Sequence, residues 1–127
     1  SISVINGEDL YKLAGDGGAR GVGITQVVPS PFSGSLKVVR EYQQALKKFA
    51  PNAKPSYASL EEYIGGRVLI ESLKHATEDM TKASVMTGLE SMNTNIGGFK
   101  IRFGPNLRTG SSFVEVSLIG QDGTSLQ

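Results

Sequence analysis

The sequence predicts an α/β fold. Segments rich in β-branched residues alternate with segments of helical periodicity along the 127 residues, as in proteins that pack helices against a sheet. Val39, Tyr42, Leu46 and Phe49 recur at helical spacing, whereas residues 99–103 alternate between apolar and basic side chains with the period of a strand. Sixteen glycines indicate many tight turns. The predicted order is strand, helix, strand, then three helices and two strands.

The N-terminal part predicts two strands around a short helix. Residues 2–5 are β-prone, and Asn6 begins a helix that ends at Gly15, a natural C-cap. Residues 22–28 form the second strand. Pro29 ends that strand, because proline cannot donate to a β-ladder.

Two helices are predicted between residues 33 and 76. Ser33 or Ser35 caps the first, which carries the amphipathic stripe. The second runs from Ser59 to Ala76, and Ser59 with Glu62 has the spacing of a capping box. Apolar residues cover so much of its circumference that we expect it to lie against a sheet.

A glycine pair, Gly65-Gly66, interrupts the second of these helices. Each glycine costs roughly 1 kcal/mol relative to alanine in a helix interior. This cost suggests that another backbone or a ligand comes close here, and close packing against the sheet is the favoured account. The alternative is two tolerated glycines without a function.

The last third predicts a helix and two strands. Thr81 caps a helix that runs through Glu90. Gly97-Gly98 introduces the alternating strand at residues 99–103, and residues 113–119 form the other strand.

Composition excludes several classes of function. A net charge of +1 gives no argument for a nucleic-acid or membrane-surface partner. No apolar run approaches the ~18 residues of a membrane span. The absence of cysteine excludes disulfides and cysteine-ligated metals. The chain begins Ser-Ile-Ser, without an initiator methionine or a signal segment, so it reads as a processed form or as a piece of a longer protein.

The residues do not predict an enzyme. His75, the one histidine, sits near a helix end, where a cation suits the helix dipole. The neighbours Glu61 and Glu62 point about 100° apart on a helix and so cannot share a reacting atom. No Gly-x-Ser-x-Gly elbow and no metal-ligand spacing occurs, so we predict no catalytic residue, no metal and no cofactor. The classes of function that remain are a small-molecule binding module and an interaction domain.

Several short sequence motifs, in this order along the chain, resemble those of one protein family. They are GVGITQVVPSP at 21–31, VVREY at 38–42, PSYASLEEY at 55–63, GGF at 97–99, FGP at 103–105 and DGT at 122–124. The series is similar to the C-terminal portion of type I periplasmic binding proteins, the branched-chain amino acid (Leu/Ile/Val) substrate-binding proteins of ABC transporters. It covers nearly the whole chain and departs from the family pattern at Glu62 and at Gly65-Gly66.

The resemblance implies a partial version of the family fold. That fold has two Rossmann-like α/β lobes joined by three crossing segments, with the ligand in the cleft between them. Residues 1–28 would then be a second-lobe segment that ends in a hinge strand. Residues 29–112 would be a first-lobe segment with three helices and a strand, and residues 113–127 a hinge strand that returns to the second lobe.

The resemblance also implies four ligand-binding residues. Ser3 corresponds to a second-lobe contact, and Tyr57, Ala58 and Tyr63 stand at the start of the long helix, where the family has a side-chain pocket. The alternative for either tyrosine is that it simply covers the core. Most groups that hold the α-amino and α-carboxylate of the ligand lie in parts of the family fold that this chain lacks.

The implied function is that of part of a periplasmic solute-binding protein of a bacterial ABC importer. The ligand would be a small amino acid or related carboxylate, the partner would be the transporter's membrane permease, and the parent would carry a signal peptide. A ligand-sensing or interaction domain of the same fold in a receptor is the alternative. Sheets that lack their central strands expose edges and apolar faces, so we expect self-association or pairing with a missing fragment.

Overall fold

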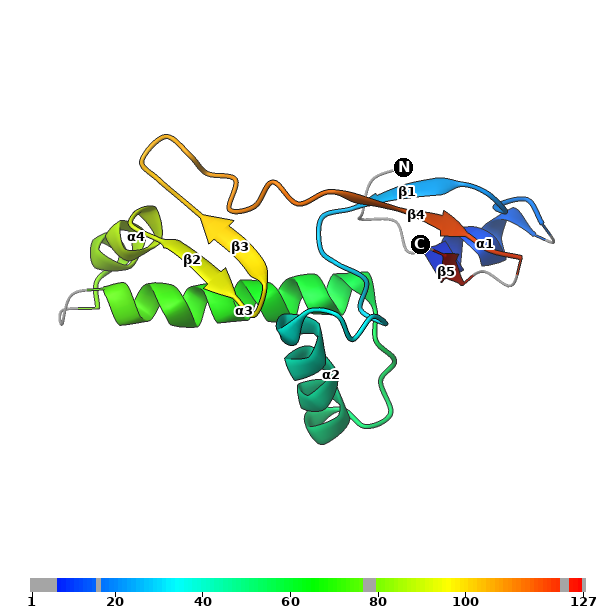
Figure 1. Ribbon diagram of the computed structural model, residues 1–127, viewed down its shortest axis with the longest axis horizontal. Helices are drawn as coiled ribbons and strands as arrows, with labels where there is room; N and C mark the ends of the chain where they lie inside the picture. The colour runs from blue at the N-terminus through cyan, green and yellow to red at the C-terminus, as the bar shows by residue number, and fades with distance from the viewer. Residues whose placement is uncertain (1–6, 16, 77–79, 122–123, 127) are drawn as a thin grey trace.

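The computed structural model describes residues 7–15, 17–76, 80–121 and 124–126, with four helices and five strands in this part of the chain (Figure 1). The elements are α1 (Gly7–Ala14), β1 (Gly23–Gln26), α2 (Lys37–Phe49), α3 (Tyr57–His75), α4 (Lys82–Glu90), β2 (Asn93–Ile96), β3 (Phe99–Arg102), β4 (Glu115–Ile119) and β5 (Ser125–Leu126). The strand predicted at residues 2–5 lies outside the described residues.

An antiparallel sheet with the order β1-β4-β5 joins the two ends of the chain. Gly23 pairs with Leu118 and Gln26 with Glu115, so the return strand β4 lies directly against β1. One face of this pair is closed by α1, where Ile24 and Ile119 are buried with Ala19. Burial alternates along β4, as the period of a strand requires, so that Ser117 and Ile119 lie on the inner face while Val116 and Leu118 are exposed.

The main core lies between α2, α3 and the antiparallel hairpin β2–β3. The side chains of α2 and α3 that face it follow helical spacing, and those of β3 alternate. The buried members on these elements are Val38, Val39, Tyr42, Leu60, Ile64, Ile96, Phe99 and Ile101. Phe49, the last residue of the predicted stripe, is exposed, so the stripe is buried only in its first part.

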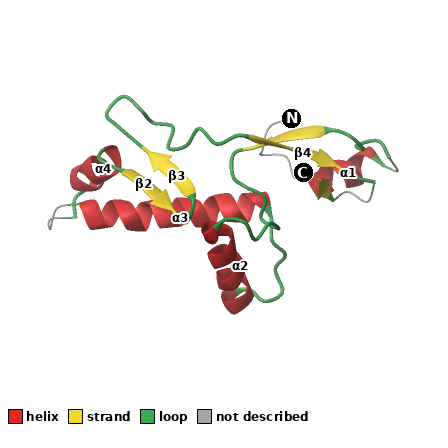
Figure 2. Cartoon of the chain, viewed as in Figure 1, coloured by secondary structure: helices red, strands yellow, loops and turns green. Residues whose placement is uncertain are grey.

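Two segments without regular structure run between the β1–β4 sheet and the part built by α2, α3, α4 and the hairpin (Figure 2). They comprise residues 27–36 and 103–114. Aromatic contacts tie each segment to the larger part: Phe32 meets Tyr57 at 6.4 Å between ring centroids, and Phe113 meets Phe99 at 5.6 Å. The predicted boundaries at 28/29 and 112/113 fall in these segments, and the assignment of the parts to two lobes stays a prediction.

Two predicted helix starts are wrong. The N-cap of α3 is Ser56, whose Oγ accepts a hydrogen bond from the Ser59 amide at 3.2 Å, so the helix begins earlier than the Ser59–Glu62 spacing suggested. The residue before α2 is Leu36, which supplies no side-chain cap. Neither Ser33 nor Ser35 therefore caps α2, and their hydroxyls lie 2.9 Å from each other instead.

The prediction that Thr81 caps α4 is confirmed, since its Oγ1 accepts from the Ser84 amide at 3.2 Å.

Strand β2 was not predicted from the sequence. Asn93–Ile96 is mostly polar and lacks the apolar alternation of β3, yet it pairs with β3 from Asn93↔Arg102 to Ile96↔Phe99. Gly97-Gly98 is thus the turn of a hairpin.

The expected close packing at Gly65-Gly66 is also wrong. A Cβ built on either glycine would meet no atom within 4 Å among the described residues. On the same helix Leu69 and Ile70 are 51% and 54% exposed, so this face is not covered by the described chain. The close approach lies at Gly88 of α4, where a Cβ would stand 2.5 Å from the carbonyl oxygen of Ser72 in α3.

Alanine substitutions at Gly65 and Gly88 should have opposite effects on the free energy of unfolding. Gly65→Ala places its methyl group in open space and should raise the free energy of unfolding by about 0.5–1 kcal/mol through helix propensity alone. Gly88→Ala should lower it by about 1–3 kcal/mol, because the new Cβ overpacks the contact between α3 and α4. Urea denaturation of the two variants beside the parent chain measures both effects. A Gly65→Ala variant less stable than the parent would show that this face is in fact covered.

Candidate functional site

The candidate site lies on the first two turns of α3, which carry three of the four predicted ligand-binding residues: Tyr57, Ala58 and Tyr63. Ser3 lies outside the described residues. Figure 1 shows that the N-terminal end of α3 is the end nearer the β1–β4 sheet. The contact between Phe32 and Tyr57 agrees with this, because Phe32 belongs to a connecting segment.

Tyr57 is half-buried beside Phe32, with the two rings in an edge-to-face arrangement at 84°. Its hydroxyl is buried and forms no hydrogen bond with the described residues. A buried polar group left in this way costs about 1–3 kcal/mol. Tyr57 therefore presents both an apolar ring and a hydrogen-bonding group close to the crossing, while its neighbour Ala58 is exposed.

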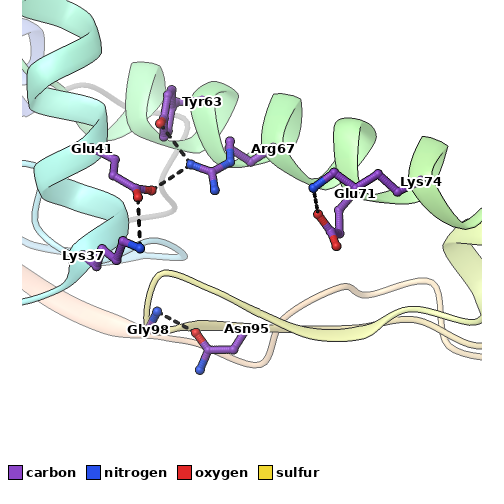
Figure 3. Close-up of polar contacts among 8 residues, drawn as sticks. All are labelled: Lys37, Glu41, Tyr63, Arg67, Glu71, Lys74, Asn95 and Gly98. Atoms are coloured by element: carbon purple, nitrogen blue, oxygen red, sulfur yellow. Dashed lines mark hydrogen bonds and ion pairs between the residues drawn. The ribbon is translucent and has the colours of Figure 1, made fainter.

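Tyr63 instead faces α2. Its ring meets the Tyr42 ring edge to face at 5.7 Å, and its hydroxyl accepts a hydrogen bond from Arg67 at 3.3 Å. The same guanidinium nitrogen donates to Glu41 at 2.7 Å, and Lys37 lies 3.5 Å from the other carboxylate oxygen (Figure 3). The structure thus gives Tyr63 a role in joining α2 to α3.

The electrostatics of this cluster follow from its hydrogen bonds. The hydrogen bond from Arg67 is the main cause that lowers the pKa of Glu41 below 4.5, although partial burial opposes it. The same bond raises the pKa of the Arg67 guanidinium. Farther along α3, the hydrogen bond from Lys74 at 2.8 Å lowers the pKa of Glu71 (Figure 3). These hydrogen bonds thus favour the ionised forms of Glu41, Arg67 and Glu71.

Tyr42 is a structural residue that the sequence did not single out for this region. Its hydroxyl lies 2.6 Å from Ser59 Oγ and accepts from the Ser56 amide at 3.1 Å. It therefore supports the first turn of α3, where Tyr57 stands. Its place in the amphipathic stripe of α2 predicted burial, but no local signal indicated its hydroxyl partners.

No catalytic constellation is formed by the residues that the structure describes. The imidazole of His75 is 51% exposed and lies 3.9 Å from Glu71 of its own helix. Within the described ranges, no three His, Cys, Asp or Glu side chains come together as a metal ion would require. In the same ranges no helix combines the length and apolar character needed to cross a membrane.

Comparison with solved structures identifies proteins of similar fold. An extracellular ligand-binding receptor from Verminephrobacter eiseniae shares 34% of its residues with this chain at a TM-score of 0.83. A possible leucine/isoleucine/valine-binding protein from Rhodopirellula baltica shares 36% at 0.86, and a substrate-binding periplasmic protein from Ralstonia solanacearum shares 27% at 0.83. No protein-family model and no curated protein matches the sequence.

These similarities extend over 99% of this chain but only 34–36% of the three proteins. The chain therefore spans about a third of their length. The resemblance and the partial α/β fold predicted from the sequence are both confirmed, and the three neighbours are named as binding or receptor proteins.

Removal of the Glu41 carboxylate should reveal its contribution to stability. A carboxyl with a folded-state pKa below its ordinary value stabilises the fold above that ordinary value and loses the effect as the pH falls through the folded-state pKa. Glu41→Gln should lower the free energy of unfolding by about 0.5 kcal/mol at pH 7, a value typical of a partly exposed ion pair.

The difference between Glu41→Gln and the parent should shrink as the pH falls from 7 toward 3, because Glu41 becomes protonated as the pH passes through its lowered pKa. Urea denaturation at the two pH values measures it. Glu62→Gln on the exposed side of α3 is the matched control and should change little at either pH. A Glu41→Gln effect that persists undiminished at pH 3 would contradict the ion-pair account.

Proposed function

Because the chain has part of the type I periplasmic-binding-protein fold, we propose that it forms part of an extracytoplasmic solute-binding protein of a bacterial ABC importer. The ligand is a small amino acid or related carboxylate held between two lobes. The observation that carries the proposal is the match to the protein from Rhodopirellula baltica named as a possible leucine/isoleucine/valine-binding protein, over 99% of this chain at 36% identity. The name of the Ralstonia solanacearum neighbour favours a periplasmic location.

Two lobes move about the two connecting segments in this proposal. Residues 1–28 and 113–127 belong to one lobe and residues 29–112 to the other. The pairing of β1 with β4 supports the grouping of the first two, since it holds the chain ends in one sheet. A ligand that contacts both lobes binds the closed form better and so shifts the population toward closure.

Within the site, Tyr57 supplies a wall of the side-chain pocket. Its position beside the connecting residue Phe32 supports this role, as does its buried hydroxyl, which has no hydrogen-bond partner among the described residues. Ala58 contributes an exposed small surface next to it, and Ser3 contributes from the other lobe. Tyr63 faces α2, where Tyr42 and Arg67 hold it, so its proposed contact with the ligand is limited to the side of the pocket next to α2.

The protein acts by binding and carries out no reaction. Its further partner is the membrane permease of the importer. A ligand-sensing domain in a receptor is the alternative function of the same fold, and a sequence that continues into a membrane span after the domain would identify it. The importer is favoured by the neighbours named as a possible leucine/isoleucine/valine-binding protein and as a substrate-binding periplasmic protein.

A chimera tests the proposed function. This chain replaces the matched third of the Rhodopirellula baltica protein, and calorimetry measures the binding of leucine, isoleucine and valine. We expect binding to at least one of them, with Tyr57→Ala at least tenfold weaker and Tyr57→Phe weakened less, because the phenylalanine keeps the ring but removes the hydroxyl. A folded chimera, verified by its circular dichroism, that binds none of them would contradict the proposal.

The isolated 127-residue chain is the control for that experiment. It should bind the three amino acids only weakly or not at all, because it supplies only part of the contacts. Micromolar affinity of the isolated chain for leucine would contradict the division of the site between this chain and other parts of the protein. A Tyr57→Ala chimera that loses stability but keeps its affinity would show that Tyr57 only covers the core.

The isolated chain should also associate with itself. Val114, Val116 and Leu118 are 66%, 55% and 47% exposed on one face of β4 and its approach, and Leu69 and Ile70 are exposed on α3. Exposed apolar surface of this kind drives association in water. Sedimentation velocity should show dimers or larger species that grow with concentration, and a compact, stable monomer would contradict this expectation.

A further inference from the structure

The outward face of the β2–β3 hairpin borders an open groove of about 700 Å³. Strand register places Asn93 opposite Arg102 and Asn95 opposite Lys100. Because alternate residues of a strand point to the same side, these four polar side chains share one face of the hairpin. All four are exposed, whereas Ile101 between the two cations is buried in the core.

The groove carries two cations and no anion. Lys100 and Arg102 are its charged lining residues, and no aspartate or glutamate lines it. Neither cation forms an ion pair with the described residues, although nearby Arg108 is paired with Glu90 at 2.8 Å. Two residues along a strand span about 7 Å, so the two basic side chains leave the backbone a short distance apart on the same face.

The opposite wall of the groove is polar and firmly attached. The amide of Arg102 donates to the carbonyl oxygen of Gly110 at 2.8 Å, which holds the connecting segment alongside β3. Gly110 lies so close to the Phe103 ring that a Cβ there would clash with it. Thr109, Ser111 and Ser112 line this wall and offer hydroxyl groups to a bound chain.

We propose that this groove binds an extended acidic segment of a partner protein. An extended chain places every second side chain on one face at the same interval as Lys100 and Arg102, so two of its carboxylates meet both cations together. The Asn95 Oδ1 already accepts from the Gly98 amide at 2.6 Å, and Ser111 Oγ accepts from the Phe113 amide at 3.0 Å. The asparagine NH2 groups and the hydroxyl donors of the opposite wall can still bind the carbonyl groups of the segment. A single small anion on such an exposed face would gain little, since salt screens each contact.

The groove is separate from the candidate ligand site. Figure 1 shows the hairpin beside the middle and the C-terminal half of α3, whereas Tyr57 begins that helix. The acidic segment and the amino acid are therefore proposed at different places on the chain, and the two proposals can fail separately.

Fluorescence anisotropy of a labelled octaglutamate peptide tests the groove with the full 127-residue chain at low salt. We expect saturable binding that weakens at least tenfold in Lys100→Glu with Arg102→Glu and at least threefold in Lys100→Gln with Arg102→Gln. The matched control, Arg20→Glu with Lys54→Glu, makes the same change of charge at exposed residues without ion pairs and should stay within twofold.

Three outcomes with the octaglutamate peptide would overturn the proposal. They are no saturable binding by the parent chain, an equal loss in the groove and control variants, and displacement of the peptide by inorganic phosphate at a concentration equal to that of glutamate residues. The last result would identify a site for small anions. An octaglutamine peptide should not bind, and binding of it as tight as that of octaglutamate would contradict the role of charge.

Discussion

The close approach of the Gly97-Gly98 turn to the first turn of α2 is the contact on which the larger part of the structure depends. The carbonyl oxygen of Gly97 accepts a hydrogen bond from the Val38 amide at 2.9 Å. Leu36 offers no side-chain cap, so the turn satisfies one of the free amides at the start of the helix. Both glycines have positive φ, 58° and 97°, and a Cβ at Gly97 would stand 2.6 Å from the Val38 nitrogen.

A series of contacts leads from this turn to the candidate site. The docked turn brings Ile96 and Phe99 over Val38 in the main core. With α2 held there, the Tyr42 hydroxyl reaches Ser59 and the Ser56 amide and so supports the first turn of α3. Tyr57 then meets Phe32 of the connecting segment. The position of the proposed ligand-facing residue thus follows from a backbone contact elsewhere in the chain.

Local patterns predicted the type of most elements but not their long-range partners. The stripe of α2, the alternation of β3 and the cap at Thr81 depend on neighbours in sequence, and the structure contains all three. The cap of α2 comes from a turn that lies far along the chain, which no local motif can reveal. Strand β2 was not predicted because its polar residues, which face the groove, break the apolar alternation of a strand. It is a strand mainly because it pairs with β3.

The glycines and the candidate residues illustrate the same limit. Gly65-Gly66 and Gly88 all lie on helices, and only the three-dimensional contact of α4 with Ser72 distinguishes the crowded glycine from the open pair. For the site, the resemblance indicated the start of α3. It could not separate Tyr57, whose hydroxyl lacks a partner among the described residues, from Tyr63, which is engaged by Arg67.

Amide hydrogen exchange of a Gly97→Ala variant tests most directly whether the turn holds the hairpin and α2 together. We expect protection to fall by at least tenfold at Val38 and along both the hairpin and α2, because the added Cβ must push the turn away from the helix. Gly34→Ala, which meets no atom within 4 Å, should leave the pattern unchanged. Gly97→Ala with unchanged protection at Val38 would contradict the account.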